Sequence, residues 1–392
     1  MSRRISVLYF SNAQVRGGAE EHILTLLRRL DRTRFAAHLV CTPAVATKLR
    51  GDVPADVGVT PLTLCHPRQL RAAAGLARII RERRVEVLHS HLFYASLFAS
   101  PIGRLCRVPF IVETPHISER WRQGLKSHYV VDRTVGRCVD RYVAVSEANG
   151  RYLTEEKGLP AQKVVVIHNG SDLGRFDPRR AAPPGLRKSL GFAEDDPIIV
   201  AVGRLEPQKG HAVLLDALAI VRRALPAVRL VCVGEGGLRA ALEAQVGVLG
   251  LSDVVRFVGQ QTNIPDWFAL ADVTVLPSLY EGLPLVAIES LACGRPMVAT
   301  AVDGTPEVVV NEETGLTVPP NEPAALAAAL TRILGDPALR GRLARAGRER
   351  VVARFSDRIQ VARTEALYEL GVGRESGVST AAVQLATAGG SR

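Results

Sequence analysis

Short apolar runs alternate with longer amphipathic segments along almost the whole chain. In the first half, the runs predict strands at Ile5–Phe10, Ala37–Cys41, Val85–Leu88, Phe110–Glu113, Arg141–Val145 and Lys163–Ile167. In the second half, they predict strands at Pro197–Val202, Val228–Val233, Val254–Val258, Asp272–Leu276, Pro296–Thr300 and Thr314–Val318. Segments with helical spacing lie between many of them, as in residues 19–30. Strands that alternate with helices are typical of α/β domains built on parallel sheets.

A proline- and glycine-rich stretch separates the two series of strands. Residues 175–191 contain three prolines and two glycines, a composition that predicts a linker. The length of 392 residues also fits two domains. We therefore expect an α/β fold with an N-terminal domain over residues 1–178 and a C-terminal domain over residues 179–355. A last helix is expected at 356–370, and residues 371–392 lack aromatic side chains and predict a disordered tail.

Two glutamates, Glu281 and Glu289, lie in a stretch that predicts a strand, a loop, a helix and a second strand. Glu281 is expected on the loop that enters the helix Leu285–Ala292, and Glu289 about two turns inside that helix. A helix N-terminus offers N–H groups to anions, and a carboxylate accepts hydrogen bonds from hydroxyls. This pattern suits a ligand that carries both phosphates and hydroxyls, such as a sugar nucleotide. The plainer alternative is one solvated glutamate and one glutamate that caps a helix.

Two other predicted loops have a composition that suits phosphate. Gly17 and Gly18 lie between the first strand and the first helix, where glycine permits close approach of the backbone to a ligand. A simple turn would explain them equally well. Arg204 and Lys209 flank a turn after the strand Pro197–Val202. Arginine can hold phosphate with two hydrogen bonds, and lysine adds a point charge.

Histidines follow two of the predicted strands. His89 and His91, two residues apart, point the same way and could bind a metal ion, but no third ligand is evident nearby. We expect one of them to line a binding site at the end of its strand. His116 follows the strand Phe110–Glu113 and is either part of the same site or a surface histidine.

The cysteines and the N-terminus indicate a cytoplasmic protein. The six cysteines form no C-x-x-C pair, so the sequence suggests neither a zinc site nor a redox motif, and scattered single thiols fit a reducing compartment. The first apolar run is too short for a signal peptide. No apolar run reaches the roughly 18 residues that a membrane-spanning helix needs.

The positive charge is concentrated in the first half of the chain. Residues 1–180 contain 29 Lys and Arg and 16 Asp and Glu, a net charge of +13, whereas residues 181–392 contain 21 and 23, a net charge of −2. A basic half suggests an anionic partner or surface. Nucleic acid is disfavoured because no recognition motif is evident and aromatic residues make up only 5% of the chain, too few for base stacking. Solvated surface arginine is the plainer reading.

Several stretches together resemble the family-4 glycosyltransferases, which are retaining enzymes of the GT-B fold. They are GGAE from Gly17, IHNGSDLGRFDP from Ile167, GRLEPQKG from Gly203, and PSLYEGLPLVAIESLACGRPMVAT followed by GTPEVV from Pro277. The resemblance covers roughly residues 5–370. It implies two Rossmann-like domains facing a central cleft, with the last helix crossing back onto the N-terminal domain. The N-terminal domain would bind the acceptor and the C-terminal domain the nucleotide sugar.

The resemblance also implies roles for individual residues. On the donor side it points to Gly17, Gly18, Gly203, Arg204, Lys209, Gly259, Glu281, Gly282, Leu283 and Glu289. Catalytic roles would fall to His116, Arg204, Lys209 and Glu281, and acceptor-side roles to Gly18, His91, His116 and Asn169. No general base is assigned, since the leaving phosphate can take the proton of the acceptor. No Asp-x-Asp stands where a metal-dependent transferase needs it, so we expect no metal and no other cofactor.

The implied reaction moves a hexosyl unit from a UDP- or GDP-sugar to a glycan or lipid-linked acceptor in the synthesis of bacterial envelope or polysaccharide. In related enzymes with lipid acceptors, a basic segment of the first domain docks on membrane. The segment Glu119–Arg141 is the candidate here, which would make the protein peripheral on the inner face of the membrane. Alternatives that remain open are a sugar-nucleotide 2-epimerase and a non-catalytic GT-B scaffold in a membrane complex.

Overall fold

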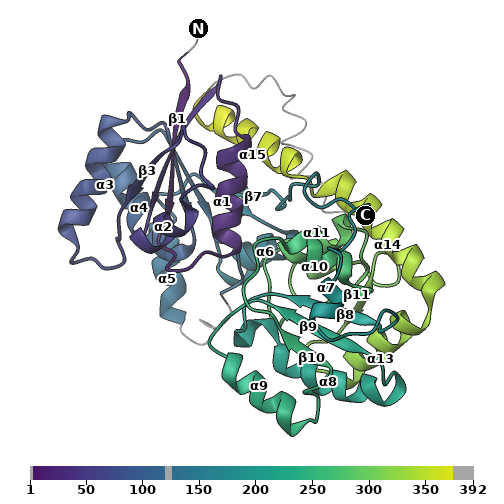
Figure 1. Ribbon diagram of the computed structural model, residues 1–392. Helices are drawn as coiled ribbons and strands as arrows, with labels where there is room; N and C mark the ends of the chain where they lie inside the picture. The colour runs from purple at the N-terminus through teal and green to yellow at the C-terminus, as the bar shows by residue number, and fades with distance from the viewer. Residues whose placement is uncertain (1–2, 120–125, 374–392) are drawn as a thin grey trace. The chain divides into compact units, whose positions relative to one another are not determined.

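The computed structural model describes residues 3–119 and 126–373, which divide into two compact units. Unit 1 comprises Met1–Gly170 and Asp357–Arg392, and unit 2 comprises Ser171–Ser356. Each unit is a parallel sheet with helices, as the alternation of strands and helices predicts (Figure 1). Among the residues that the structure describes, no helix has both the length and the apolar composition needed to cross a bilayer.

Unit 1 contains a seven-stranded sheet in its described residues, in the order β3-β2-β1-β4-β5-β6-β7. The strands are β1 Ile5–Ser11, β2 Phe35–Cys41, β3 Gly58–Pro61, β4 Val87–His91, β5 Phe110–Thr114, β6 Arg141–Ala144 and β7 Val164–Val166. The helices are α1 Gly18–Arg29, α2 Pro43–Leu49, α3 Leu70–Glu82, α4 Phe93–Leu105, α5 Lys126–Val135, α6 Glu147–Arg151 and α15 Asp357–Gly371. The central strands are apolar and buried on both faces, as parallel sheets require.

Unit 2 contains a six-stranded sheet in the order β10-β9-β8-β11-β12-β13. Its strands are β8 Ile198–Val202, β9 Arg229–Val233, β10 Val255–Phe257, β11 Val273–Leu276, β12 Met297–Thr300 and β13 Leu316–Val318. Its helices are α7 Leu186–Ser189, α8 His211–Ala224, α9 Arg239–Val248, α10 Ile264–Leu270, α11 Leu285–Ala292, α12 Thr305–Val308, α13 Pro323–Gly335 and α14 Pro337–Arg354. Leucine and valine side chains from both faces of this sheet form the core.

The last helix, α15, belongs to unit 1 although unit 2 precedes it in the chain. It lies against α1 (Figure 1). Arg29 Nε donates to Asp357 Oδ2 at 2.7 Å, and Arg34 Nη1 donates to Glu369 Oε1 at 2.7 Å. Unit 2 begins at Ser171, earlier than the boundary expected after residue 178, because the Ser171 N–H donates to Phe355 O at 3.0 Å and joins both ends of this unit.

The predicted strands of unit 1 do not include β3, and no helix was predicted at α2 or α4. Helix α4 contains Pro101 in its interior and buries most of one side against β4 and β5. Proline removes a helical hydrogen bond, so local propensity disfavours this helix and tertiary burial outweighs it. The segment that follows Ser146 is not one regular α-helix: α6 is followed by a π-helical turn, Tyr152–Glu156, which the Lys157 N–H closes by donating to Tyr152 O at 3.0 Å.

Two sequence-based expectations concern residues that the structure does not describe. The expected tail lies, from residue 374 onward, outside the described residues. The same holds for Arg120, Trp121 and Arg122 of the basic segment, whereas α5 carries Arg133 and Arg137 follows it.

Replacement of Gly210 by alanine is expected to destabilise unit 2. Gly210 has φ +64°, and a Cβ atom there would lie 2.0 Å from the carbonyl oxygen of Pro277. Because a left-handed residue with a side chain costs about 1–2 kcal/mol and the backbone must also move, we expect Gly210→Ala to lower the free energy of unfolding by at least about 2 kcal/mol in urea titrations.

Gly247→Ala is the matched control, since a Cβ atom at this position of α9 would meet nothing within 4 Å. Alanine should stabilise that helix by up to about 1 kcal/mol. A Gly210→Ala protein as stable as the Gly247→Ala protein would show that the loop before α8 is not constrained in this way.

Candidate functional site

The strand order of unit 2 identifies where its ligand site should lie. From β8 the chain runs outward through β9 and β10, then returns to β11 on the other side of β8 and runs through β12 and β13. The loops after β8 and β11 therefore leave the same edge of the sheet in opposite directions. Such a switch point, at the carboxyl ends of parallel strands, is where open α/β sheets bind their ligands. Arg204 and Lys209 lie on the first of these loops, and Glu281 lies on the second.

Glu281 is a buried carboxylate held from several directions. Its side chain is 7% exposed, and its Oε1 lies 2.5 Å from Lys209 Nζ and accepts a 2.7 Å hydrogen bond from Ser278 Oγ. Its own N–H donates to Asp303 Oδ2 at 2.8 Å. The structure thus brings two predicted catalytic residues, Lys209 and Glu281, into direct contact.

The two switch-point loops are also joined through Gln208. Its Nε2 donates to Tyr280 O at 3.0 Å, and the Leu279 N–H donates to its backbone oxygen at 2.8 Å. Arg204 is exposed, and its guanidinium donates to Gln208 Oε1 at 3.3 Å. The exposed Arg204 and the ion pair of Lys209 therefore lie on one connected network at the sheet edge.

Glycines let three strand-end loops approach one another closely. The Gly203 N–H donates to Val233 O at 3.0 Å, and the Gly234 N–H donates to Gly259 O at 2.9 Å. A Cβ atom on Gly234 would lie only 1.9 Å from Gly203 O. The predicted donor-side residues Gly203 and Gly259 therefore lie at the carboxyl ends of β8 and β10, on either side of the loop that follows β9 at Gly234.

The remaining predicted donor-side residues lie at the start of α11. Gly282 and Leu283 are buried in the turn before the helix. The helix begins at Leu285, so Glu289 lies about one turn from its start, and the predicted position two turns inside the helix was wrong. Glu289 is half-buried. Pro284 is the N-cap residue, so the helix begins where the sequence predicted, and four residues from Leu285 to Glu289 make only about one turn.

His211 was not singled out from the sequence, although it follows the GRLEPQKG motif directly. It is the first residue of α8 and is buried. Burial, together with the nearby charge of Lys209, lowers the pKa of His211 to about 4, so the imidazole is neutral at pH 7. Its Nδ1 has no hydrogen-bond partner among the described residues.

Unit 1 has its own switch point, between β1 and β4. The loop after β1 leads to Gly17, the N-cap of α1, and Gly18, the first helical residue. The Gly17 N–H donates to Glu20 Oε2 at 3.0 Å, and Ser11 Oγ donates to Glu20 Oε1 at 3.1 Å. A Cβ atom on Gly18 would meet nothing within 4 Å, so Gly18 adjoins open space. Burial raises the pKa of Glu20.

Four histidines of unit 1 form one buried cluster. His91 Nδ1 lies 2.9 Å from His116 Nε2, and His22 Nδ1 lies 2.8 Å from Asn169 Oδ1. His22 meets His116 edge-on, with ring centroids 4.9 Å apart. His116 is therefore not the surface histidine that the sequence left open. The three predicted acceptor-side residues His91, His116 and Asn169 lie together.

The rest of the histidine cluster was missed from the sequence. His22 lies four residues after Gly18, about one turn into α1. This closeness to the predicted glycine loop is the one signal in the sequence that could have identified it. Gln360 of α15 lies 3.0 Å from His22 Nδ1. His89 Nδ1 and Nε2 contact Tyr368 OH at 2.6 Å and Thr114 Oγ1 at 2.7 Å. Both ring nitrogens of His89 are therefore in use, which disfavours the metal interpretation of His89 and His91.

A buried lysine holds the loop that carries His116. Lys157 Nζ lies 2.8 Å from Glu119 Oε2 and 2.9 Å from Asp132 Oδ1, and its side chain is 1% exposed. Nearby, burial raises the pKa of Glu113 to about 7, against the opposing effects of the Ser96 hydrogen bond and the charge of Lys157. Glu113, which accepts a hydrogen bond from Ser96, lies three residues before His116, and Glu119 lies three residues after it, so buried carboxyl groups stand on both sides of this histidine.

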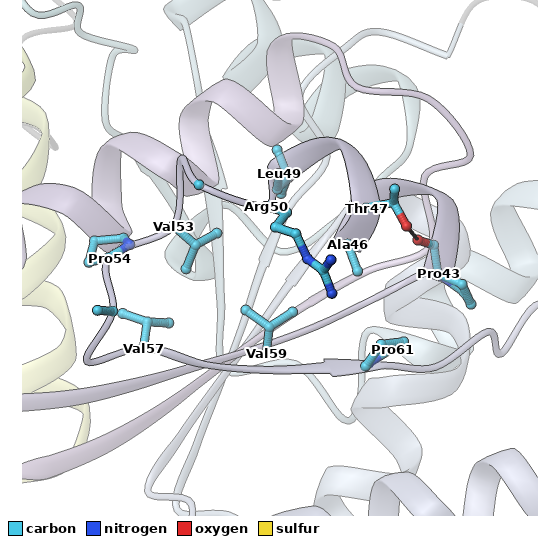
Figure 2. Close-up of a pocket in the computed structure, with 12 residues that line it drawn as sticks. Pro43, Ala46, Thr47, Leu49, Arg50, Val53, Pro54, Val57, Val59 and Pro61 are labelled. Carbon is cyan, nitrogen blue, oxygen red and sulfur yellow. Dashed lines mark hydrogen bonds between the residues drawn. The ribbon is translucent and has the colours of Figure 1, made fainter.

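A separate cavity of about 410 Å³ lies between α2 and the edge strand β3. Figure 2 shows the Arg50 side chain extending from the end of α2 toward Val59. None of the predicted site residues lines this cavity. It carries no part of the site described above.

Comparison with known proteins identifies the same two halves. Residues 184–350 match the family model for glycosyl transferases group 1, and residues 16–175 match the model for glycosyltransferase family 4. A D-inositol 3-phosphate glycosyltransferase of Streptomyces avermitilis is 38% identical over 371 residues, covering 84% of this chain and 78% of that protein. One from Thermomonospora curvata is 39% identical over 220 residues, covering 52% of this chain but only 51% of that protein.

Solved structures agree on the fold. HepE of Anabaena, crystallised with UDP, superposes with a TM-score of 0.82 at 23% identity, covering 93% of this chain and 100% of that chain. The same protein has also been crystallised with UDP-glucose. At this level of identity the likeness speaks for the fold alone, and it confirms the predicted GT-B fold.

The pH dependence of stability should reveal the buried carboxyl of Glu113. Its pKa in the folded protein, about 7, lies above the ordinary value of 4.5. Between these values the folded state holds a proton that the unfolded state has lost, so the contribution of Glu113 to stability falls as pH rises from about 4.5 to 7 and is constant outside this window. Relative to Glu113→Gln, whose amide does not titrate, the native protein should lose about 2–3 kcal/mol across it.

Urea unfolding of both proteins between pH 4.5 and 8 measures this difference. The comparison cancels the titration of the buried histidines, which changes stability in the opposite direction. A difference that does not vary with pH would mean that Glu113 titrates alike in the folded and unfolded chain.

Proposed function

The chain belongs to the family-4 glycosyltransferases (glycosyl transferases group 1), and we propose on this premise that it transfers a hexosyl unit from a nucleoside-diphosphate sugar to a glycan or lipid-linked acceptor. The configuration of the transferred sugar is retained. The single observation that carries this proposal is the Lys209–Glu281 pair at the switch point of unit 2, with Arg204 exposed beside it.

Arg204 and Lys209 hold the diphosphate of the donor in this proposal. As the bond to the sugar breaks, negative charge develops on the leaving diphosphate, and two fixed cations stabilise that charge without a metal ion. Arg204 is suited to two-pronged contact with phosphate, and Lys209 to a point contact. Lys209 is already oriented by Glu281, so little reorganisation is needed when the donor binds.

Glu281 accepts hydrogen bonds from the hydroxyls of the sugar, and Glu289 from those of the ribose. Glu281 lies on the loop between β11 and α11, where its contacts with Lys209 and Ser278 support a fixed geometry, and Glu289 lies on α11 itself. Gly203 and Gly259 let the backbone approach the nucleotide, as the close packing of their loops permits. The UDP bound to Anabaena HepE supports UDP as the first nucleotide to test.

On the acceptor side we propose that Gly18, His91, His116 and Asn169 act together in unit 1. Gly18 adjoins open space at the start of α1, and His116 retains 7% exposure at the edge of the histidine cluster. We place the reaction in the synthesis of envelope lipid or polysaccharide, at the inner face of the membrane.

Calorimetric titration with UDP and with GDP in the presence of EDTA tests the donor site. We expect one nucleotide to bind, and Arg204→Ala and Glu289→Ala each to weaken that binding about 10- to 100-fold, since a hydrogen bond to a charged group contributes about 1.5–3 kcal/mol. Arg179→Ala is the control, because Arg179 is an exposed arginine of unit 2 that pairs with Asp177. No binding of either nucleotide would favour the scaffold alternative, and binding only with added metal would refute the metal-free mechanism.

Membrane docking by the basic segment can be measured with vesicles. Arg133 is exposed on α5 and Arg137 is exposed just after it. Because each arginine near an anionic surface contributes about 1 kcal/mol, replacing both with alanine should weaken binding to phosphatidylglycerol vesicles roughly 10- to 30-fold in a sedimentation assay. Phosphatidylcholine vesicles serve as the control surface. Unchanged binding of the double variant would exclude this segment as the docking site.

A further inference from the structure

We propose that His91 is a positioning residue that fixes the tautomer of His116, so that His116 meets its ligand as a hydrogen-bond donor from Nδ1 and not as a base. The ligand atom would be an oxygen of a sugar hydroxyl or of a phosphate. This identity of the ligand rests on the proposed function, whereas the tautomer itself does not.

The register of the sheet places the two histidines side by side. Strand β4 pairs with β5 so that His91 lies opposite Thr114, and His116 follows two residues later. His91 Nδ1 then lies 2.9 Å from His116 Nε2, with the two rings inclined by only 29°. Both side chains are buried, His91 fully and His116 to all but 7%.

One hydrogen bond between two neutral imidazoles needs one N–H and one lone pair. In the first arrangement His91 Nδ1–H donates to His116 Nε2, and His116 carries its proton on Nδ1. In the second, His116 Nε2–H donates to His91 Nδ1, and His91 must then carry its own proton on Nε2.

The surroundings of His91 Nε2 decide between these arrangements. This atom is buried and has no hydrogen-bond partner among the described residues. The second arrangement would leave a buried N–H without an acceptor, and orphaned N–H groups are rarer in folded proteins than under-satisfied acceptors. The first arrangement leaves only a lone pair there. The geometry therefore puts the proton of His91 on Nδ1 and the proton of His116 on Nδ1.

Neutral rings are what this cluster favours. Burial lowers the pKa of His22 to about 4 and those of His89, His91 and His116 well below the ordinary value of 6.5. A charged imidazolium would also face the other rings across ring centroid distances of 4.2–5.4 Å. Each ring therefore carries one proton at neutral pH, so both arrangements of the His91–His116 hydrogen bond involve neutral imidazoles.

His22 confines the ring of His116 from another side. It meets His116 edge-on, with an angle of 89° between the rings. His22 Nδ1 lies 2.8 Å from Asn169 Oδ1, and Gln360, whose Oε1 accepts the Gly170 N–H at 2.7 Å, lies beside the same ring. His116 Nε2 is thus occupied, and Nδ1, which makes no hydrogen bond to the described residues, is the nitrogen left for a ligand.

Long-range ¹H–¹⁵N correlation spectra of the full chain, labelled with ¹⁵N-histidine, read the tautomer directly at pH 7.5. His116→Asn and His91→Asn assign the signals by their disappearance. We expect His116 to have a protonated Nδ1 and an unprotonated Nε2. A proton on His116 Nε2, or on both nitrogens, would overturn the proposal. This experiment needs neither donor nor acceptor.

Two substitutions at His91 test the positioning role in the reaction. The amide nitrogen of His91→Asn can occupy the place of Nδ1 and donate to His116, whereas His91→Leu cannot. With the donor that calorimetry selects, we expect His91→Leu to lower kcat at least tenfold with unchanged nucleotide affinity, and His91→Asn to retain most of kcat. Equal losses in both, at equal unfolding midpoints, would overturn the proposal.

His38→Asn and His38→Leu are the matched controls. His38 is a buried histidine of β2 whose Nε2 contacts Thr60 Oγ1 at 2.9 Å, outside the cluster. Both should transfer sugar as the native chain does. If the native chain transfers no sugar from any donor, the proposed function fails, and the ¹⁵N spectra still decide the tautomer.

Discussion

The ion pair of Lys209 and Glu281 is the interaction on which the donor half of this protein depends. A carboxylate buried as deeply as that of Glu281 is costly unless it is paired and hydrogen-bonded, and it receives both Lys209 and the Ser278 hydroxyl. The pair can form only because β8 and β11 are adjacent in the sheet, although 72 residues separate its members. The glycines around it allow three backbone loops to pack at the same sheet edge.

Unit 1 meets the same physical requirement with different chemistry. It buries four imidazoles and keeps them neutral, and it buries Lys157 between two carboxylates. The lysine holds Glu119 on the segment that carries His116, while α15 supplies Gln360 and Tyr368 to the histidines. The last helix of the chain therefore has a place in the predicted acceptor side as well as in the packing of unit 1. Its ion pairs with Arg29 and Arg34 keep it against α1.

Many of the strands and helices could be predicted because their signals are local. Apolar runs identified strands such as β1 and β11, and the proline and glycine that bracket α11 predicted its ends to the residue. The motifs that resemble the family, in turn, predicted the GT-B fold that the comparison with solved structures confirmed. Helix α4 was not predicted because Pro101 and its apolar composition give no helical signal, and its burial against β4, β5 and the neighbouring helices stabilises it.

The sequence by itself determined the α/β class, the succession of strands and helices, and which charged residues stand at strand ends. Alternating hydrophobicity and turn residues are properties of neighbouring positions, so they can be read without knowing the fold. Only the tertiary structure decided that Lys209 pairs with Glu281, that His22 and Gln360 join His91 and His116, and that Glu113 is held near a pKa of about 7. These depend on burial and on the order of strands in the sheet, which bring together residues that no short stretch of sequence connects.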